Sequence, residues 1–183
     1  KARMNLKEIL AEHPKGIEYG WILEGFDKFP LLTDDKGEVM SMVPIINSNF
    51  TGKLEAGDDI MFFEATGTDE NAVNLAANIF AYVLHDRAFE IYSASIKNKK
   101  TIETPLLKTE HLKVKKGDFS RIFGIELKDA EIKALAERAQ YNFSNYNVEI
   151  PSYRNDMLHP VDFMEDLGIM YGFTIFTNFF DSR

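Results

Sequence analysis

Cysteine is absent from this chain of 183 residues. Its absence excludes disulfides and thiolate metal sites and suits a protein of the reducing cytosol. No apolar run approaches the roughly 20 residues that a membrane-spanning helix needs. The first residues, Lys1 to Met4, are not followed by the hydrophobic core of a signal peptide. We therefore expect a soluble, cytoplasmic protein with no membrane contact.

Basic residues are fewer than acidic ones: there are 21 Lys and Arg and 29 Asp and Glu, which gives a net charge of −8 and a pI of 5.1. The surface as a whole should repel RNA, so any contact with nucleic acid must come from a local basic patch. One such patch comprises Lys97, Lys99, Lys100, Lys108, Lys113, Lys115 and Lys116. A solvated surface is the alternative interpretation of these lysines.

The composition is that of a folded protein. Hydrophobic residues make up 45% of the chain and there are only 6 prolines, so a core can form. The length permits either one large domain or two small ones.

The first part of the chain predicts a helix followed by strands. Residues 5–12 carry apolar side chains on one helical stripe, and residues 13–16 end that helix. Residues 29–32 and 39–42 flank Asp34-Asp35-Lys36-Gly37 and predict a hairpin. Residues 60–65 predict a further apolar strand.

A long helix follows that strand. From Asp69 the apolar residues recur every three or four positions, which predicts about five helical turns. Residues 89–96 then return as a strand. A strand, a helix and a strand after a hairpin imply one sheet with the helix packed across it.

After Pro105 the predicted elements become shorter. They are a strand at 112–115, a helix at 119–123 closed by Gly124, a helix at 129–140, β structure at 141–153 and a helix from His159-Pro160 to about Tyr171-Gly172. We predict an α+β protein of two modules: a sheet-plus-helix module at 1–104 and a small winged-helix-like module at 105–175. Residues 176–183 would begin a linker.

Four carboxylates lie close together near the end of the chain: Asp156, Asp162, Glu165 and Asp166. If Pro160 opens the last helix, Asp162 lies in its first turn and the two later acids are its i+3 and i+4 neighbours. Converging carboxylates repel, and a hard oxygen-binding cation, above all Mg²⁺, would relieve that repulsion. Alternatively, the helix dipole alone favours acids in a first turn. His159 can cap the helix or contact Asp162.

Two stretches resemble one protein family. Residues 151–162, with Glu165-Asp166 and Tyr171-Gly172-Phe173, resemble the signature of the fifth module of the phenylalanine–tRNA ligase beta subunit. Residues 13–16, 40–48 and 64–69 resemble its editing module, the third and fourth, in the archaeal and eukaryotic-cytosolic form. The chain is therefore expected to be an internal fragment of such a subunit, whose editing module begins upstream of Lys1.

The resemblance implies two sites. In the family, a magnesium ion shared with the alpha subunit is assigned to acids that fall here on Asp156, Asp162, Glu165 and Asp166. The family's editing pocket, which hydrolyses tyrosine wrongly attached to the phenylalanine tRNA, falls on Leu32, Ser41, Asn47, Glu64 and Thr66. Glu64 stands where archaeal members usually carry the shorter Asp.

The resemblance also implies partners and an activity. These are the alpha subunit, within an α2β2 heterotetramer, and tRNA(Phe), in ATP-dependent aminoacylation. The aminoacylation site belongs to the alpha subunit in this family, and nothing in the chain resembles its motifs.

Each pocket residue also has an ordinary structural interpretation. Leu32 in a hairpin would be core, Ser41 a hydrogen-bonded core hydroxyl, and Asn47 and Thr66 partners of backbone groups beside turns. A second hypothesis is therefore a non-catalytic module that docks a protein or RNA and holds a structural cation or none. A freestanding metal-dependent hydrolase ranks last, because the two acidic sites lie in different modules.

Overall fold

The computed structural model describes residues 3–172. The chain divides into two compact units, and the division falls between Thr66 and Gly67 in the sequence. The predicted module boundary near Thr104 lies inside the second unit and stays a prediction. Residues 176–183, the predicted start of a linker, lie outside the described residues.

The first unit opens with two short helices, α1 (Leu6–Glu12) and α2 (Pro14–Tyr19), followed by a 3-10 turn, η1 (Gly20–Leu23). Asn5 caps α1 and forms a capping box with Glu8. Residues 13–16 end α1 as predicted, but they also begin α2, which the sequence analysis missed. Proline is favoured in a first turn, and His13 Nδ1 accepts a hydrogen bond from the Lys15 amide at 3.1 Å.

Glycine is required where α1 and α2 meet. A Cβ atom at Gly16 would lie 1.8 Å from the carbonyl oxygen of Ile9. Any side chain at position 16 would therefore force the two helices apart.

The first unit also holds a small antiparallel sheet, in the order β1 (Leu31–Thr33), β2 (Val39–Met42), β3 (Ile46–Asn47). In the turn between β1 and β2, the Asp34 carboxylate accepts hydrogen bonds from the amides of Lys36 and Glu38, and Gly37 has a φ of +82°. The predicted hairpin is confirmed. A small core of Leu23, Met42 and Ile45 lies beside the sheet.

The strand predicted at 60–65 is wrong. These residues form neither strand nor helix, and Ile60 and Phe62 are exposed. A strand is stabilised by its hydrogen-bonded neighbours, and no strand within residues 3–172 pairs with this segment. An apolar pattern alone was therefore not enough to form it.

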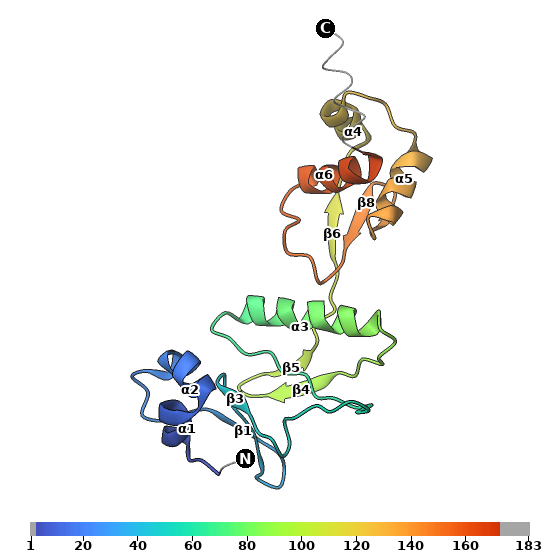
Figure 1. The fold of residues 1–183 in the computed structure, drawn as a ribbon. Coiled ribbons are helices and arrows are strands. Elements are labelled where there is room, and N and C mark those ends of the chain that lie inside the picture. Colours follow the sequence, from blue (N-terminus) through green and yellow to red (C-terminus); the bar gives the residue numbers. More distant parts are fainter. Residues whose placement is uncertain (1–2, 173–183) are drawn as a thin grey trace. The chain divides into compact units, whose positions relative to one another are not determined.

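The second unit begins with the long helix α3 (Glu70–His85), as predicted (Figure 1). Asp69 caps it by accepting a hydrogen bond from the Ala72 amide at 2.8 Å. Strand β4 (Ala94–Lys97) starts later than the predicted 89 and pairs antiparallel with β5 (Thr101–Thr104) in a sheet of its own. The expected single sheet with the helix across it is therefore wrong, because β4 pairs with its immediate neighbour in sequence.

The rest of this unit follows the predicted order of elements: β6 (Glu110–Lys113), α4 (Lys116–Phe123), α5 (Asp129–Arg138), β7 (Asn142–Ser144), β8 (Asn147–Ile150) and α6 (Pro160–Tyr171). The strands form an antiparallel sheet in the order β6-β8-β7. Gly124 ends α4 with a φ of +69°. Residues 3–172 thus contain six α-helices and three small antiparallel sheets, which confirms the α+β class. None of these helices combines the length and apolarity needed to cross a bilayer.

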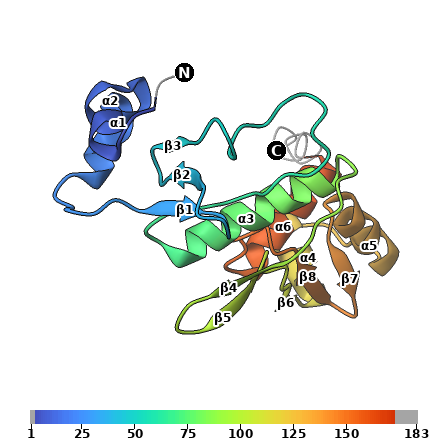
Figure 2. The same cartoon turned by 90° about the horizontal axis from the view of Figure 1, so that it is seen from below.

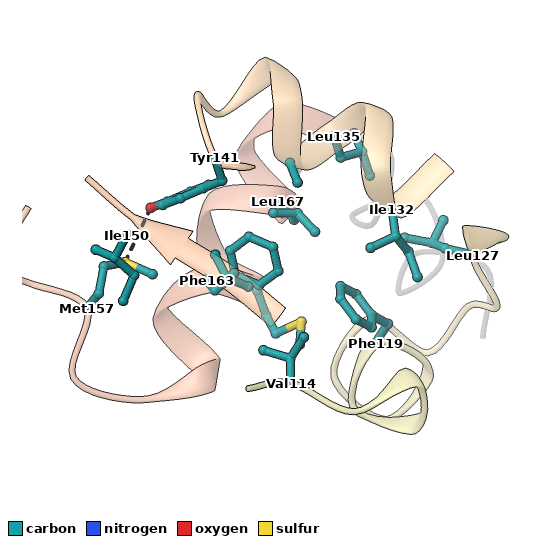
Figure 3. Close-up of a cluster of buried hydrophobic side chains, with 13 residues drawn as sticks. Val114, Phe119, Leu127, Ile132, Leu135, Tyr141, Ile150, Met157, Phe163 and Leu167 are labelled. Carbon is teal, nitrogen blue, oxygen red and sulfur yellow. Dashed lines mark hydrogen bonds between the residues drawn. The ribbon is translucent and has the colours of Figure 1, made fainter. Parts of the chain in front are cut away.

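The main core lies between α4, α5, α6 and the sheet β6-β8-β7 (Figure 3). Its largest fully buried side chains are Phe119, Phe163, Ile132, Met164, Leu167 and Val148. The Phe163 ring lies edge-on to Tyr141, with ring centroids 5.2 Å apart. This apolar packing fixes the orientation of α6, the helix that carries three of the four acids.

Helix α3 is tied to the segments around this core by a buried side chain. Asn78 is 5% exposed, and its amide group donates hydrogen bonds of 2.9 Å to the carbonyl oxygens of Leu106 and Ser152. One turn further along, Tyr82 packs edge-on against Tyr153 with ring centroids 4.7 Å apart. These contacts join three segments that lie far apart in the sequence.

Candidate functional site

Three of the five pocket residues implied by the resemblance form one row across the first sheet. Leu32 on β1 lies opposite Ser41 on β2, and Ser41 lies opposite Asn47 on β3. Figure 2 shows the three strands side by side. Directly opposed residues on neighbouring strands share a face, with Cβ atoms about 4.5–5.5 Å apart. An apolar side chain, a hydroxyl and an amide are thereby brought together.

The central residue of this row has an unusual environment. Ser41 is 6% exposed, and its hydroxyl finds no hydrogen-bond partner within the described part of the chain. Leaving a buried polar group unpaired costs about 1–3 kcal/mol. The Ser41 hydroxyl therefore has an unused donor and an unused acceptor within the described residues.

A β-bulge lies beside the row. The partner of Leu32 is Ser41, but the partner of Thr33 is Val39, so Met40 has no counterpart on β1. Bulges re-aim side chains and are common next to active sites. Here the bulge directly precedes Ser41 in the chain.

The loop after β3 folds back onto the same strands. The amide of Ser48 donates to the Met40 carbonyl at 2.7 Å. A Cβ atom at Gly52 would lie 2.7 Å from that carbonyl oxygen and 2.9 Å from Asn47 Cβ, so only glycine fits this approach. The amide of Asn47 reaches the Gly52 carbonyl only at 3.5 Å, a weak hydrogen bond that leaves the amide available to other partners.

The other two implied pocket residues, Glu64 and Thr66, lie on the exposed segment that forms no strand. Within residues 3–172, neither side chain makes a hydrogen bond or ion pair with Leu32, Ser41 or Asn47. The strand pairing therefore brings together three of the five residues, and Glu64 and Thr66 lie outside the paired strands.

The acids near the end of the chain are organised by an arginine. Arg154 donates two hydrogen bonds to Asp156, at 2.7 and 2.8 Å, and one to Asp166 at 2.9 Å. Its hydrogen bonds to Asp156 hold the pKa of that carboxyl below its ordinary value. The same pairing raises the pKa of Arg154. One guanidinium thus neutralises two of the four predicted metal ligands.

Tyr141 completes this cluster from the start of the sheet. Its hydroxyl donates a hydrogen bond to Asp166 and contacts the Met157 sulfur at 3.3 Å (Figure 3). The Arg154 guanidinium carbon lies 5.7 Å from the Tyr141 ring centre. Burial, followed by the bond to Asp166, raises the Tyr141 pKa, so the phenol stays protonated. Neither role was predicted from the sequence, although Arg154 lies two residues before the first acid.

The remaining two acids, Asp162 and Glu165, form no hydrogen bond with Arg154 or Tyr141. Asp162 accepts the amides of Leu158 and His159, at 2.8 and 2.7 Å, and so caps α6. His159 also caps this helix by accepting the Val161 amide at 3.2 Å. Glu165 is exposed.

The four acids differ in their partners within the described residues, and the magnesium ion shared with an alpha subunit stays a prediction. Among the described residues no group of three or more His, Asp or Glu side chains converges closely enough to hold one. Asp156 and Asp166 already share the positive charge of Arg154, and Asp162 is committed to backbone amides.

Comparisons with known proteins agree on one family. Residues 112–173 match the model of the tRNA synthetase B5 domain. The phenylalanine–tRNA ligase beta subunit of Pyrococcus horikoshii is 37% identical over 178 residues, which cover 94% of this chain and 32% of that protein. The beta subunit of Borreliella burgdorferi (strain ZS7) is 38% identical over 185 residues, with the same coverage. The chain thus spans about a third of the length of these relatives.

A solved structure shares the fold. It is the crystal structure of an N-terminal fragment of the phenylalanyl-tRNA synthetase beta subunit from Pyrococcus horikoshii. The TM-score is 0.82 at 35% identity, and the match covers 94% of this chain and 51% of that one. Both units of the chain therefore have counterparts in one known polypeptide.

Proposed function

We propose that the chain serves as part of the beta subunit of phenylalanine–tRNA ligase, because residues 112–173 match the tRNA synthetase B5 domain and 94% of the chain aligns with such a subunit at 37% identity. The first unit contributes to hydrolytic editing of tyrosine attached to the phenylalanine tRNA. The second unit contributes to association with the alpha subunit in a cytoplasmic α2β2 enzyme that attaches phenylalanine to tRNA(Phe) with ATP.

The chemistry of the substrates explains why editing is needed. Tyrosine has one hydroxyl more than phenylalanine, and the apolar amino-acid pocket of an aminoacylation site rejects an added hydroxyl poorly. A pocket with a hydrogen-bonding partner for the phenol can select tyrosine for hydrolysis, because a ligand without the hydroxyl leaves that partner unpaired.

The row of Leu32, Ser41 and Asn47 supplies the groups that such a pocket needs. Leu32 offers an apolar contact for an aromatic ring, and Asn47 offers an amide that can donate or accept. The observation that carries the proposal is the buried, unpaired hydroxyl of Ser41. In the proposed pocket it pairs with a polar group of the bound tyrosyl end.

Glu64 and Thr66 have a separate proposed role. An acid and a hydroxyl can orient a water for attack on an ester without forming a covalent intermediate. Both residues lie on the exposed 60–66 segment. The role therefore requires this segment to lie against the row of three residues in the active enzyme.

Ser41→Ala in the complete two-subunit enzyme tests the pocket, with hydrolysis of preformed Tyr-tRNA(Phe) as the readout. The variant should hydrolyse it more slowly, while attachment of phenylalanine is unchanged. The matched control is Ser93→Ala, which removes an exposed hydroxyl in the second unit. Hydrolysis at the wild-type rate in Ser41→Ala would defeat the pocket assignment.

The second candidate function is a docking module without catalysis. The observation that favours it is that Glu64 and Thr66 lie on a segment without strand pairing and form no hydrogen bond with Ser41. It predicts that Glu64→Ala and Thr66→Ala leave hydrolysis of Tyr-tRNA(Phe) unchanged, and editing predicts a loss in at least one.

A further inference from the structure

Charge is distributed very unevenly along this chain. Residues 97–116 contain seven lysines and two acids, whereas the rest contains 14 basic and 27 acidic residues, a net charge of −13. A mixture that served only solubility would not need such segregation. Three of these lysines fall within four positions, at Lys97, Lys99 and Lys100.

The structure puts these three lysines at the end of the β4–β5 hairpin (Figure 1). Lys97 pairs with Thr101 in the last rung, and the amide of Asn98 donates to the Lys100 carbonyl at 3.1 Å to close the turn. All three lysine side chains are exposed. The tip therefore presents three ammonium groups to solvent within one tight turn.

Acids neutralise other lysines of the chain but not these. Lys15 pairs with Glu18 at 3.0 Å, and Lys116 pairs with Asp129 at 2.8 Å. No acid among residues 3–172 lies within ion-pair distance of Lys97, Lys99 or Lys100. The one acid of the hairpin strands, Glu103, accepts a hydrogen bond from Ser95.

Three unpaired like charges do not stabilise the hairpin that carries them. An isolated two-stranded hairpin is only marginally stable, and neighbouring like charges repel. An external polyanion would relieve that repulsion. Flexible lysines without aromatic neighbours at the tip suit a regular series of phosphates, which they would contact without reading a base sequence.

We propose that the tip of the β4–β5 hairpin binds the phosphate backbone of tRNA. The inference rests on the proposed function for its choice of RNA. It adds a surface outside both the editing row and the acids of the B5 domain. The contact anchors the tRNA electrostatically and does not select among sequences.

The test is tRNA binding by the complete two-subunit enzyme as salt is varied. The variant Lys97→Gln/Lys99→Gln/Lys100→Gln should weaken binding at least about tenfold at 0.1 M salt, and the slope of log K against log salt should become shallower by about 2 to 3. The control Lys7→Gln/Lys28→Gln/Lys36→Gln removes the same charge from exposed, dispersed lysines of the first unit. It should leave the slope near that of the wild type.

The outcomes separate this proposal from the proposed function. An unchanged slope in the hairpin variant, or an equal change in the control, would overturn the phosphate contact even if Tyr-tRNA(Phe) hydrolysis is normal. A failure of the Ser41→Ala test leaves the salt measurement intact. A change in the preference among tRNA sequences between the wild type and the hairpin variant would also contradict a contact made only with phosphates.

Discussion

The side-chain amide of Asn78, on α3, donates a hydrogen bond of 2.9 Å to the carbonyl oxygen of Ser152, 74 residues further along the chain. The same nitrogen donates to the Leu106 carbonyl at the same distance. One buried side chain thus satisfies two backbone carbonyls from separate segments.

Replacing Asn78 by Ala should lower the free energy of unfolding by about 1–3 kcal/mol, because two carbonyl groups lose their donor. Chemical denaturation measures the change. Asn71→Ala, at an exposed position on the same helix, is the control and should change stability far less. Equal effects of the two substitutions would mean that the Asn78 contacts contribute nothing specific.

Ser41→Ala should not lower the free energy of unfolding as Asn78→Ala does. Removing a buried hydroxyl that has no partner should leave stability unchanged or raise it by up to about 1 kcal/mol, since no hydrogen bond is lost. Thermal unfolding of the chain tests this directly. A clear loss of stability would show that Ser41 has a structural partner in solution, which would weaken its assignment to the pocket.

The cluster around Arg154 predicts the response to magnesium. Millimolar Mg²⁺ should not raise the Tm of this chain above a KCl control of equal ionic strength, because Arg154 already neutralises Asp156 and Asp166. Arg154→Gln should unfold at a lower temperature and should gain a rise with Mg²⁺, since Asp156 loses its cationic partner and Asp166 keeps only the hydrogen bond from Tyr141. A specific Mg²⁺-dependent rise in the unsubstituted chain would contradict this reading of the acids.

Acidification should weaken the same cluster. The pKa of Asp156 in the folded chain is depressed by Arg154, so its contribution is fully present above the unfolded value of about 3.9 and is lost as pH falls through the folded pKa. Asp156→Asn removes that contribution at neutral pH. The stabilities of the two chains should therefore converge as urea denaturation is repeated from pH 6 towards pH 3, and a gap that stays constant would exclude the linkage.

The core of the second unit should be sensitive to truncation at its centre. Phe163 is fully buried and packs against the rings of Phe119, Tyr141 and Phe143. Phe163→Ala should destabilise the chain by about 3–5 kcal/mol through lost burial and a residual cavity. Val161→Ala, at an exposed position on the same helix, should lower the free energy of unfolding much less. Equal losses in the two variants would mean that burial of Phe163 is not the source of the effect.

Local sequence signals predicted five of the six α-helices and the hairpin of β1 and β2. Asp69 before an apolar period of three and four predicted α3, and Gly124 predicted the end of α4, because caps and periodicity act within one element. The turn of Asp34 and Gly37 predicted the first hairpin for the same reason. Each of these signals is complete within a few residues.

Features that depend on distant partners were missed. The apolar residues 60–65 suggested a strand, but a strand needs a neighbour that its own sequence cannot supply. The acids near α6 suggested a metal site, which stays a prediction, but nothing in their spacing indicated that Tyr141, 25 residues before Asp166, donates to that carboxylate. Spacing located the charges and could not show which group neutralises them.

The row of Leu32, Ser41 and Asn47 lies between these cases. The resemblance named the residues, and only the strand register showed that they are neighbours. The same resemblance named Glu64 and Thr66, which lie outside the paired strands that form the row, so their place in the pocket stays a prediction.

The solitary hydroxyl of Ser41 also has a consequence for selectivity. When a buried polar group is unpaired in the free protein, the free protein bears the cost of its desolvation. A ligand group that completes the hydrogen bond recovers that cost, because the hydroxyl was already removed from water when the protein folded. The group that discriminates between tyrosine and phenylalanine would in that case already be desolvated in the free protein.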